Sequence, residues 1–390
     1  MKITRTIQSL MLTTALALGA LATSASAGES IKVGFPVPLT GEFAPYTEVQ
    51  GARCMAKMIN QQGGVNGMKF ELLVQDVGSD TQAAISLAEK YMNQGIVALG
   101  TIAFSDTLIP VGQVLSAKGV TIIQAQSTQV EMHKGVIDNF ISNVAPDPYT
   151  ASAAANYALK QGIKNVVIFK TDEGGSWSAR TPQWFADVIV AKGGKLLKTL
   201  NFTGKTTDWS PQIAELKALN PAPDAVYLSW GMPNIGVLIR QMRAAGLDAW
   251  VIGSDGFDDP SLDALGEKNP SLLDKVFFGT LAPSTPGSNM DKFQKKCAEM
   301  GVEVKGMFPS LGADVIKTIA YGVKKSGSTD PFAVRKAILE ADSIPVMTVD
   351  SISFKETKSY PTRKIPVVGF KNGKRTLLSL DVPENVPSWK

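Results

Sequence analysis

Four polar loops in the sequence each follow a short apolar run, and together they could bind a small charged molecule. Three of them contain Tyr46, Ser105 and the segment 124–128, and the fourth contains Asp255. The first three offer hydroxyl groups and backbone N–H donors, whereas Asp255 offers a carboxylate. A zwitterion held between them would place its carboxylate on one side and its ammonium group on the other.

Ser105 stands where an apolar run, 96–99, passes into a segment whose apolar residues recur at helical spacing. Ser105 or Asp106 would cap this helix. The N–H groups at a helix start lack partners within the helix and attract small anions such as carboxylates. An ordinary capping serine explains the same residues, and Asp255 could likewise close an Asx-turn. Both interpretations of each residue stay open at this point.

The sequence lacks the motifs of the common enzyme classes. Gly204-Lys205-Thr206 ends like a phosphate-binding loop, but Thr199 stands where that loop needs a glycine. There is no G-x-S-x-G nucleophile elbow. His133 is the only histidine, so a catalytic triad or a His-rich metal site would depend on it alone, and its polar neighbours predict a solvated loop. We therefore expect a non-catalytic protein with no metal and no cofactor.

The N-terminus has the pattern of a secretory signal peptide. Lys2 and Arg5 precede a short apolar run, Leu10 to Ala22, and Ala25-Ser26-Ala27 is a small-residue cleavage signal. Cleavage after Ala27 would release an exported protein, since no later stretch is long enough to span a membrane. In a cell with two membranes, this predicts a periplasmic location.

Composition excludes several partners. The net charge is only +4, and no Lys/Arg cluster suggests nucleic-acid binding. With 44% hydrophobic and 19% charged residues, the chain is globular. Cys54 and Cys297 are too few for a disulfide framework. Export permits one bridge between them, but buried free thiols are the interpretation we favour.

Strands and helices alternate along the mature chain with short connections, which predicts mainly parallel sheets with right-handed crossovers. Predicted strands cover 31–37, 70–76, 96–99, 120–123, 165–170, 195–202, 225–229, 250–253, 276–279, 347–354 and 365–370. Predicted helices lie around 52–59 and 105–118 and cover 81–93, 149–160, 177–191, 209–219, 233–245, 289–300, 309–324 and 331–340.

The alternation pauses around residues 143–148 and 281–286, which we interpret as crossings between two domains. The prediction is an α/β fold of two doubly wound, mainly parallel-sheet lobes. Residues 1–27 are the signal peptide. Lobe 1 comprises 28–145 and 284–346, and lobe 2 comprises 146–283 and 347–390. Because ligands bind at the carboxyl ends of parallel strands, a cleft between the lobes is the expected site.

Several segments resemble, in order and spacing, periplasmic binding proteins of the leucine/isoleucine/valine type. The matching segments are 33–46, Gly51-Ala52, Ile59-Asn60, 63–67, 240–247, 252–256, 330–339 and 371–374, and the match covers essentially the whole mature chain. The resemblance implies the class I periplasmic-binding fold with three hinge crossings. It also implies capture of a small ligand by closure of the lobes and delivery to an inner-membrane ABC permease.

The resemblance also assigns roles to residues by position. It implies that Ser105 holds the ligand carboxylate, assisted by Gln126 and Thr128, that Asp255 pairs with the ligand ammonium, and that Tyr46 lines the cleft. The sequence departs from the family at the side-chain pocket. Trp177 and Trp230 lie where the family has other aromatic positions, and Gln126 and Ser127 replace alanines. Trp177 and Trp230 are either pocket or core residues, and in the pocket they would suit a flat ligand.

The expected function is capture of an amino acid or related small carboxylate by a monomeric solute-binding protein. An aromatic acid, an amide or a polyol is the alternative ligand on the same fold. A sensor that passes ligand occupancy to a membrane receptor would have the same sequence features.

Overall fold

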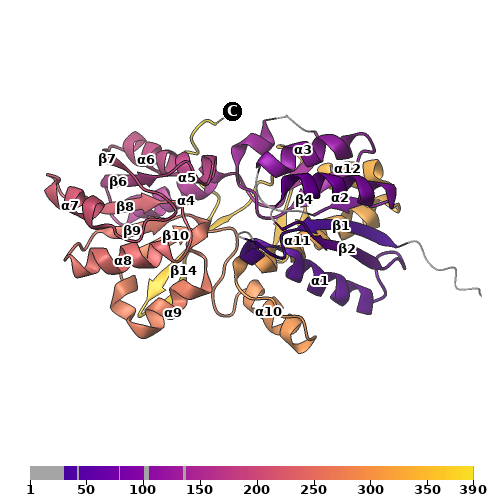
Figure 1. The fold of residues 1–390 in the computed structure, drawn as a ribbon. Coiled ribbons are helices and arrows are strands. Elements are labelled where there is room, and N and C mark those ends of the chain that lie inside the picture. Colours follow the sequence, from indigo (N-terminus) through magenta and orange to yellow (C-terminus); the bar gives the residue numbers. More distant parts are fainter. Residues whose placement is uncertain (1–29, 42–43, 79, 101–104, 135–137, 390) are drawn as a thin grey trace, which may run out of the picture.

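A five-stranded parallel sheet forms the core of the first lobe (Figure 1). The computed structural model describes residues 30–41, 44–78, 80–100, 105–134 and 138–389, so the predicted signal peptide lies outside the described residues. In order across the sheet, the strands are β2 (Phe70–Asp76), β1 (Ile31–Val37), β3 (Ala98–Leu99), β4 (Thr121–Gln124) and β5 (Phe140–Ser142). All neighbours are parallel. The short β5 is an addition to the strands that the sequence pattern predicts.

A seven-stranded mixed sheet forms the core of the second lobe. Its order is β14 (Lys374–Asp381), β13 (Ile365–Lys371), β10 (Val276–Gly279), β9 (Trp250–Gly253), β8 (Ala225–Leu228), β6 (Asn165–Lys170) and β7 (Lys195–Asn201). The strands from β7 to β10 are parallel, and β13 and β14 continue the sheet in antiparallel pairing. A third sheet pairs β11 (Ile344–Pro345) with β12 (Ser351–Ile352).

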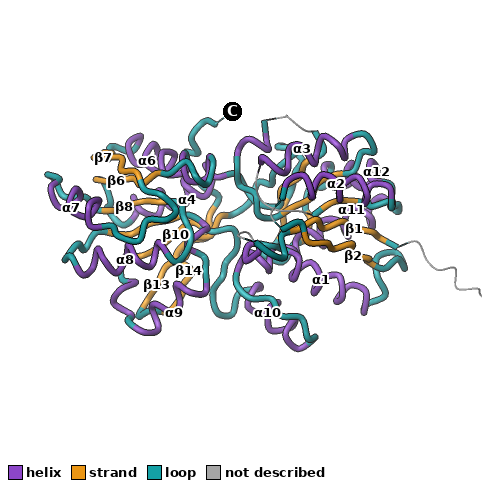
Figure 2. Tube along the Cα trace, in the orientation of Figure 1, coloured by secondary structure: helices purple, strands orange, loops and turns teal. Residues whose placement is uncertain are grey.

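Helices cover both faces of each large sheet (Figure 2). In the first lobe, the helical segments are η1 (Ala44–Tyr46), α1 (Val49–Gln61), α2 (Thr81–Asn93), α3 (Ser105–Ser116), η2 (Val130–His133), α10 (Asn289–Glu299), α11 (Met307–Ser326) and α12 (Pro331–Leu339). In the second, they are α4 (Asp147–Lys160), α5 (Ser176–Ala179), α6 (Thr181–Ala191), α7 (Ser210–Ala218), α8 (Asn234–Ala244), η3 (Asp255–Phe257), α9 (Pro260–Lys268) and η4 (Pro270–Leu273). Buried apolar clusters fill the layers on each side of both sheets. The predicted α/β fold class is confirmed.

Local capping explains where several helices begin. The Asp80 and Asp330 carboxylates accept from the N–H groups of Ala83 and Ala333, three residues on, at 3.0 and 2.9 Å. α9 is absent from the predicted helices, although Asp259 and Pro260 form a typical helix start, and Asp259 accepts from the Ser261 N–H at 2.7 Å.

The strand order places the candidate loops together. In the parallel part of each large sheet, the order in which successive strands are added reverses direction at one pair of neighbouring strands. This pair is β1 and β3 in the first sheet and β6 and β8 in the second. Ligands of open α/β sheets bind outside the carboxyl ends of the strands at such switch points. Tyr46 and Ser105 follow β1 and β3, and Trp177 and Trp230 follow β6 and β8.

Arg363 joins the three segments that connect the lobes. Its side chain is buried, with 5% exposed, and it donates to the carbonyls of Asn143, in the first crossing, and Leu281, in the second, at 2.7 and 2.9 Å. It also donates to the Thr348 hydroxyl at 3.1 Å, and Thr348 donates to the buried Asp314 of α11. Arg363 itself lies in the third connection, residues 355–364, which runs from Phe354 in the core of the first lobe to β13 of the second, so one guanidinium contacts all three connections.

The two cysteines form a disulfide, which corrects the expectation of free thiols. Cys54 of α1 and Cys297 of α10 lie with their Cα atoms 5.7 Å apart and their sulfurs 2.01 Å apart. Both helices pack against α11, and this brings together residues 243 positions apart in the chain.

His133 also lies elsewhere than predicted. Its ring is half-buried and contacts the rings of Phe140, Tyr360 and Trp389, and Nδ1 is 3.0 Å from the Ser359 hydroxyl. The prediction of a solvated loop was wrong because the C-terminal segment folds back over η2, which a local sequence pattern does not indicate.

None of the helices in the described part of the chain is long and apolar enough to cross a membrane.

Candidate functional site

Asp255 lies buried at the carboxyl end of β9, in the short η3 turn. Its side chain has one strong donor, the Trp177 indole, whose Nε1 lies 2.9 Å from Oδ1. Burial raises the pKa of Asp255 to about 6, and the Trp177 N–H opposes this shift by stabilising the carboxylate. No ion pair with Asp255 occurs among the described residues. The turn is held by Asp258, which accepts from Thr280 and Ser284 at 2.5 and 2.6 Å.

Trp177 and Trp230 form a stacked pair next to Asp255. Their ring centroids are 6.2 Å apart and their planes are inclined by 28°. Gly256 permits this arrangement, because a Cβ there would lie 2.2 Å from the Trp230 carbonyl oxygen and 2.8 Å from the Trp177 ring. Both indoles are partly exposed. The structure therefore places them beside the buried carboxylate, at the surface of lobe 2's core.

On the other lobe, Ser105 is the first residue of α3, as expected for a residue at a helix start. Its N–H donates to the Gln129 side-chain oxygen at 2.9 Å, so this donor is already occupied. The amide nitrogen of Gln129 lies 2.9 Å from where a Cβ on Gly175 would be. Gln129 thus connects α3 to the loop that carries Trp177. The residues just before Ser105, 101–104, lie outside the described part of the chain.

The loop that contains Gln126 and Thr128 is shaped by Gln124. The Gln124 side-chain oxygen accepts from the N–H groups of Gln126 and Ser127, and its nitrogen donates to Ser142 Oγ at 2.7 Å. The Gln126 carboxamide is buried, and neither of its polar atoms has a hydrogen-bond partner in the described structure. Thr128 contributes its carbonyl, which accepts from the N–H of Asp147 in lobe 2 at 2.8 Å.

Tyr46 reaches across to the second lobe. Its ring packs edge-on against Phe308 with centroids 5.3 Å apart, and its hydroxyl lies 3.1 Å from where a Cβ on Gly231 would be. A second contact between the lobes joins Ser176 Oγ to Glu131 Oε2 at 2.7 Å. Tyr46 and Trp230, the neighbour of Gly231, therefore lie at the same contact between the lobes.

The geometry thus brings the seven predicted residues to facing strand ends. Four residues that sequence reasoning missed also lie there: Gln129, Glu131, Asp147 and Tyr227. Gln129 and Glu131 belong to the polar run that follows β4, and this run could have indicated that both residues lie at the candidate site. Tyr227 lies inside an apolar strand, where nothing in the sequence distinguishes it from a core residue.

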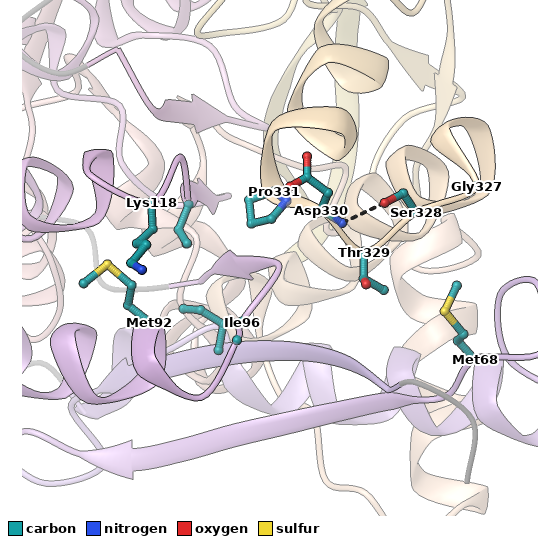
Figure 3. Close-up of a pocket in the computed structure, with 11 residues that line it drawn as sticks. Met68, Met92, Ile96, Lys118, Gly327, Ser328, Thr329, Asp330 and Pro331 are labelled. Atoms are coloured by element: carbon teal, nitrogen blue, oxygen red, sulfur yellow. Dashed lines mark hydrogen bonds between the residues drawn. The ribbon is translucent and has the colours of Figure 1, made fainter. Parts of the chain in front are cut away.

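A separate surface pocket of about 510 Å³ lies away from these loops. One side of the pocket is lined by Met92 and Ile96, which precede β3, and by Lys118, which precedes β4. The other side is lined by residues 328–331 (Figure 3). It is therefore at the amino ends of the strands, opposite the candidate site. The described residues include no group of acidic, His or Cys side chains that could hold a metal.

Known proteins of similar sequence and structure fit this geometry. Residues 30–375 match the family model described as periplasmic binding protein. A Leu/Ile/Val-binding protein of Rhizobium johnstonii is 24% identical over 364 residues, covering 93% of this chain and 97% of its own.

Two solved structures share the fold. A leucine-binding protein from Thermotoga maritima has a TM-score of 0.74 at 22% identity, covering 91% of this chain and 99% of its own. A solute-binding protein of an ABC transporter from R. palustris, in complex with 4-hydroxybenzoate, has a TM-score of 0.76 at 16% identity, covering 93% and 99%. Because the family model spans residues 30–375 of the 390, this protein belongs to the periplasmic binding protein family.

Proposed function

We propose that this protein is an exported, non-catalytic solute-binding protein that captures an amino acid or a related small carboxylate between its lobes. The observation that carries the proposal is Asp255, a buried carboxyl at a strand end with only an indole N–H as its strong donor. A buried carboxylate without a cation is costly, and a ligand ammonium would compensate it. Ser105 and Thr128, on the facing loops, are assigned to the ligand carboxylate.

An aromatic acid is the second candidate ligand, because of the stacked Trp177 and Trp230. Flat rings stack favourably on indoles, and one structural neighbour holds 4-hydroxybenzoate. An acid without an amine would have to give Asp255 a hydroxyl donor instead. The two ligand classes therefore differ in the donor that they offer to Asp255, an ammonium group or a hydroxyl group.

The proposal has four further parts. The protein is exported through the signal peptide, residues 1–27, is located in the periplasm and is a monomer. It delivers its ligand to an inner-membrane ABC permease. The Leu/Ile/Val-binding relative and the ABC-transporter neighbour support the transport role over a sensor role. Uptake of labelled ligand by cells with and without the gene distinguishes transport from sensing.

The test begins with a thermal-shift screen of amino acids and aromatic acids, since a bound ligand raises the melting temperature. Calorimetry then compares Asp255→Ala with the control Asp172→Ala, an exposed acid of the same lobe. We expect Asp255→Ala to abolish amino-acid binding while the fold survives, and Asp172→Ala to bind normally. Near-normal affinity of the Asp255 variant would exclude the proposed role of this residue.

A further inference from the structure

We propose that Asp147 is a second ligand-binding carboxyl, which acts with Asp255 to select a ligand whose buried end is a cationic N–H group. This inference rests on the proposed function and specifies it. It assigns the ammonium group to a site with two carboxyls in lobe 2, and therefore the ligand carboxylate to lobe 1.

Asp147 is fully buried and lacks a partner. It is the first residue of α4, with 0% of its surface exposed, and its backbone N–H donates to the Thr128 carbonyl. Neither carboxyl oxygen has a hydrogen-bond partner in the described structure. Native proteins satisfy nearly all buried polar groups, so an unpartnered carboxyl beside the loop that contains Thr128 points to a partner that arrives with the ligand.

The charged groups around Asp147 are all acidic. Burial raises its pKa well above the ordinary value, and the charges of Asp255 and Glu131 raise it further. The nearby Thr128 hydroxyl lowers the pKa of Asp147 in part, although its position relative to the carboxyl does not meet the geometry of a hydrogen bond. No Lys or Arg in the described part of the chain forms an ion pair with Asp147, Asp255 or Glu131. A cation is therefore the missing component.

Three buried hydroxyls lie at the same strand ends. Tyr227 lies in β8 just before its last residue, Leu228, Ser229 directly follows β8, and Ser254 follows the neighbouring β9. The hydroxyl oxygens of these residues have no hydrogen-bond partner among the described residues. Burial raises the pKa of Tyr227, and the charges of Asp255 and Asp147 add to the shift, so its ring lies near both acids. The two carboxyls disfavour a ligand carboxylate at this place. Together with the lone pairs of the three hydroxyls, they provide acceptors for a group with several N–H donors.

A purely structural role is the competing explanation. An acidic residue in the first turn of α4 interacts favourably with the helix dipole without any ligand. That role would change stability but would not distinguish ligands with an amine from ligands without one. Ligand selectivity is therefore the decisive readout.

The experiment uses matched pairs of ligands that differ only in the amine. The pairs are L-leucine with 4-methylpentanoate and L-phenylalanine with 3-phenylpropanoate, titrated into the wild type, Asp147→Asn and the control Asp187→Asn, an exposed acid of α6. We expect Asp147→Asn to weaken binding of the amino acids by about tenfold or more, as for loss of a charged hydrogen bond. The deaminated acids should bind Asp147→Asn at least as well as the wild type, and Asp187→Asn should behave as the wild type.

Equal weakening of both members of a pair in Asp147→Asn would overturn the inference while leaving the proposed function standing. If the wild type binds the deaminated acids but neither amino acid, this inference fails while capture of a small carboxylate stands.

Discussion

The indole of Trp177 sets the ionisation of Asp255. It is the one strong donor that the structure shows on this carboxyl, at 2.9 Å, and it favours the charged form that would bind an amine. Trp177→Phe keeps an aromatic ring near Trp230 but removes the donor. We expect the pKa of Asp255 to rise above about 6, and amine affinity near neutral pH to fall about tenfold or more, as for loss of a hydrogen bond to a charged group.

Carbon NMR of the Asp255 carboxyl measures the titration directly. Trp250→Phe, a change at a partly buried tryptophan of the same lobe, serves as the control. An unchanged midpoint in Trp177→Phe would show that the indole does not stabilise the carboxylate.

Asp255 should also make stability depend on pH. Its pKa in the folded protein, about 6, exceeds the ordinary 3.8, so the folded state binds more protons than the unfolded state between these values. Stability should therefore increase as the pH falls from 7 through 6 toward 4. The shift from 3.8 to about 6 corresponds to about 3 kcal/mol at neutral pH.

Asp255→Asn removes this titration while keeping an acceptor for Trp177. Urea unfolding of the unliganded protein at several pH values should show a smaller pH dependence in Asp255→Asn and a higher stability at pH 7. Parallel curves for the variant and the wild type would contradict the assignment.

The residues that sequence reasoning found are those that follow predicted strands. Ser105, Asp255, Trp177 and Trp230 each lie within a few residues of the end of an apolar run, so βα alternation alone indicates their shared edge. Asp147 was not found because Pro146 and Pro148 mark its surroundings as a connection between domains. Its position depends on the contact of its N–H with the Thr128 carbonyl and on the packing of α4 against β10 and β13, which no local pattern contains.

Among the elements, the three crossings depend on Arg363. Its guanidinium donates to the buried carbonyls of Asn143 and Leu281 and to the Thr348 hydroxyl. The negative charge of the nearby Asp314 favours the charged form of Arg363. Arg363→Met should therefore destabilise the protein by about 3–5 kcal/mol, because it leaves a buried acid and two carbonyls uncompensated. The exposed neighbour, in Lys364→Met, should change stability by less than about 0.5 kcal/mol.

Urea unfolding measures both variants. If Arg363→Met and Lys364→Met have the same unfolding midpoint as the wild type, the guanidinium does not hold the crossings together.

Element prediction succeeded where caps and periodicity agree and failed where the chain bends within a periodic segment. The sequence pattern predicts one helix over 177–191, but the structure divides it at Arg180 into α5 and α6, and in α5 Trp177 donates to Asp255 and Ser176 to Glu131. Pro182, in the first turn of α6, is typical of a helix start and was the available signal.

At the scale of the whole molecule, the fold class followed from βα alternation, but the pairing of distant segments did not. Sequence spacing cannot report that α1 and α10 are neighbours, which is why the Cys54–Cys297 bridge was missed. The exact limits of the two lobes stay a prediction. Ile352 and Phe354, for example, pack into the core of the first lobe, although the sequence places residues 347–390 in the second.

The bridge should contribute strongly to stability, because it closes a segment of 243 residues. The double variant Cys54→Ser/Cys297→Ser should lose about 2–5 kcal/mol. Thermal unfolding with and without reductant checks this for the wild type, and the double variant should be insensitive to reductant. Equal melting temperatures of the oxidised wild type and the double variant would show that the bridge adds no stability.

The bridge also turns most of the chain into a covalent ring. Both cysteines belong to the first lobe, whereas the strands from β6 to β10 lie between them in sequence. A single protease cut at the exposed Gly193, between α6 and β7, would open the ring without releasing a fragment. The two pieces would migrate as one species on a gel without reductant and separate when reductant is added, so the two parts of the first lobe stay covalently linked even when the backbone of the second lobe is broken.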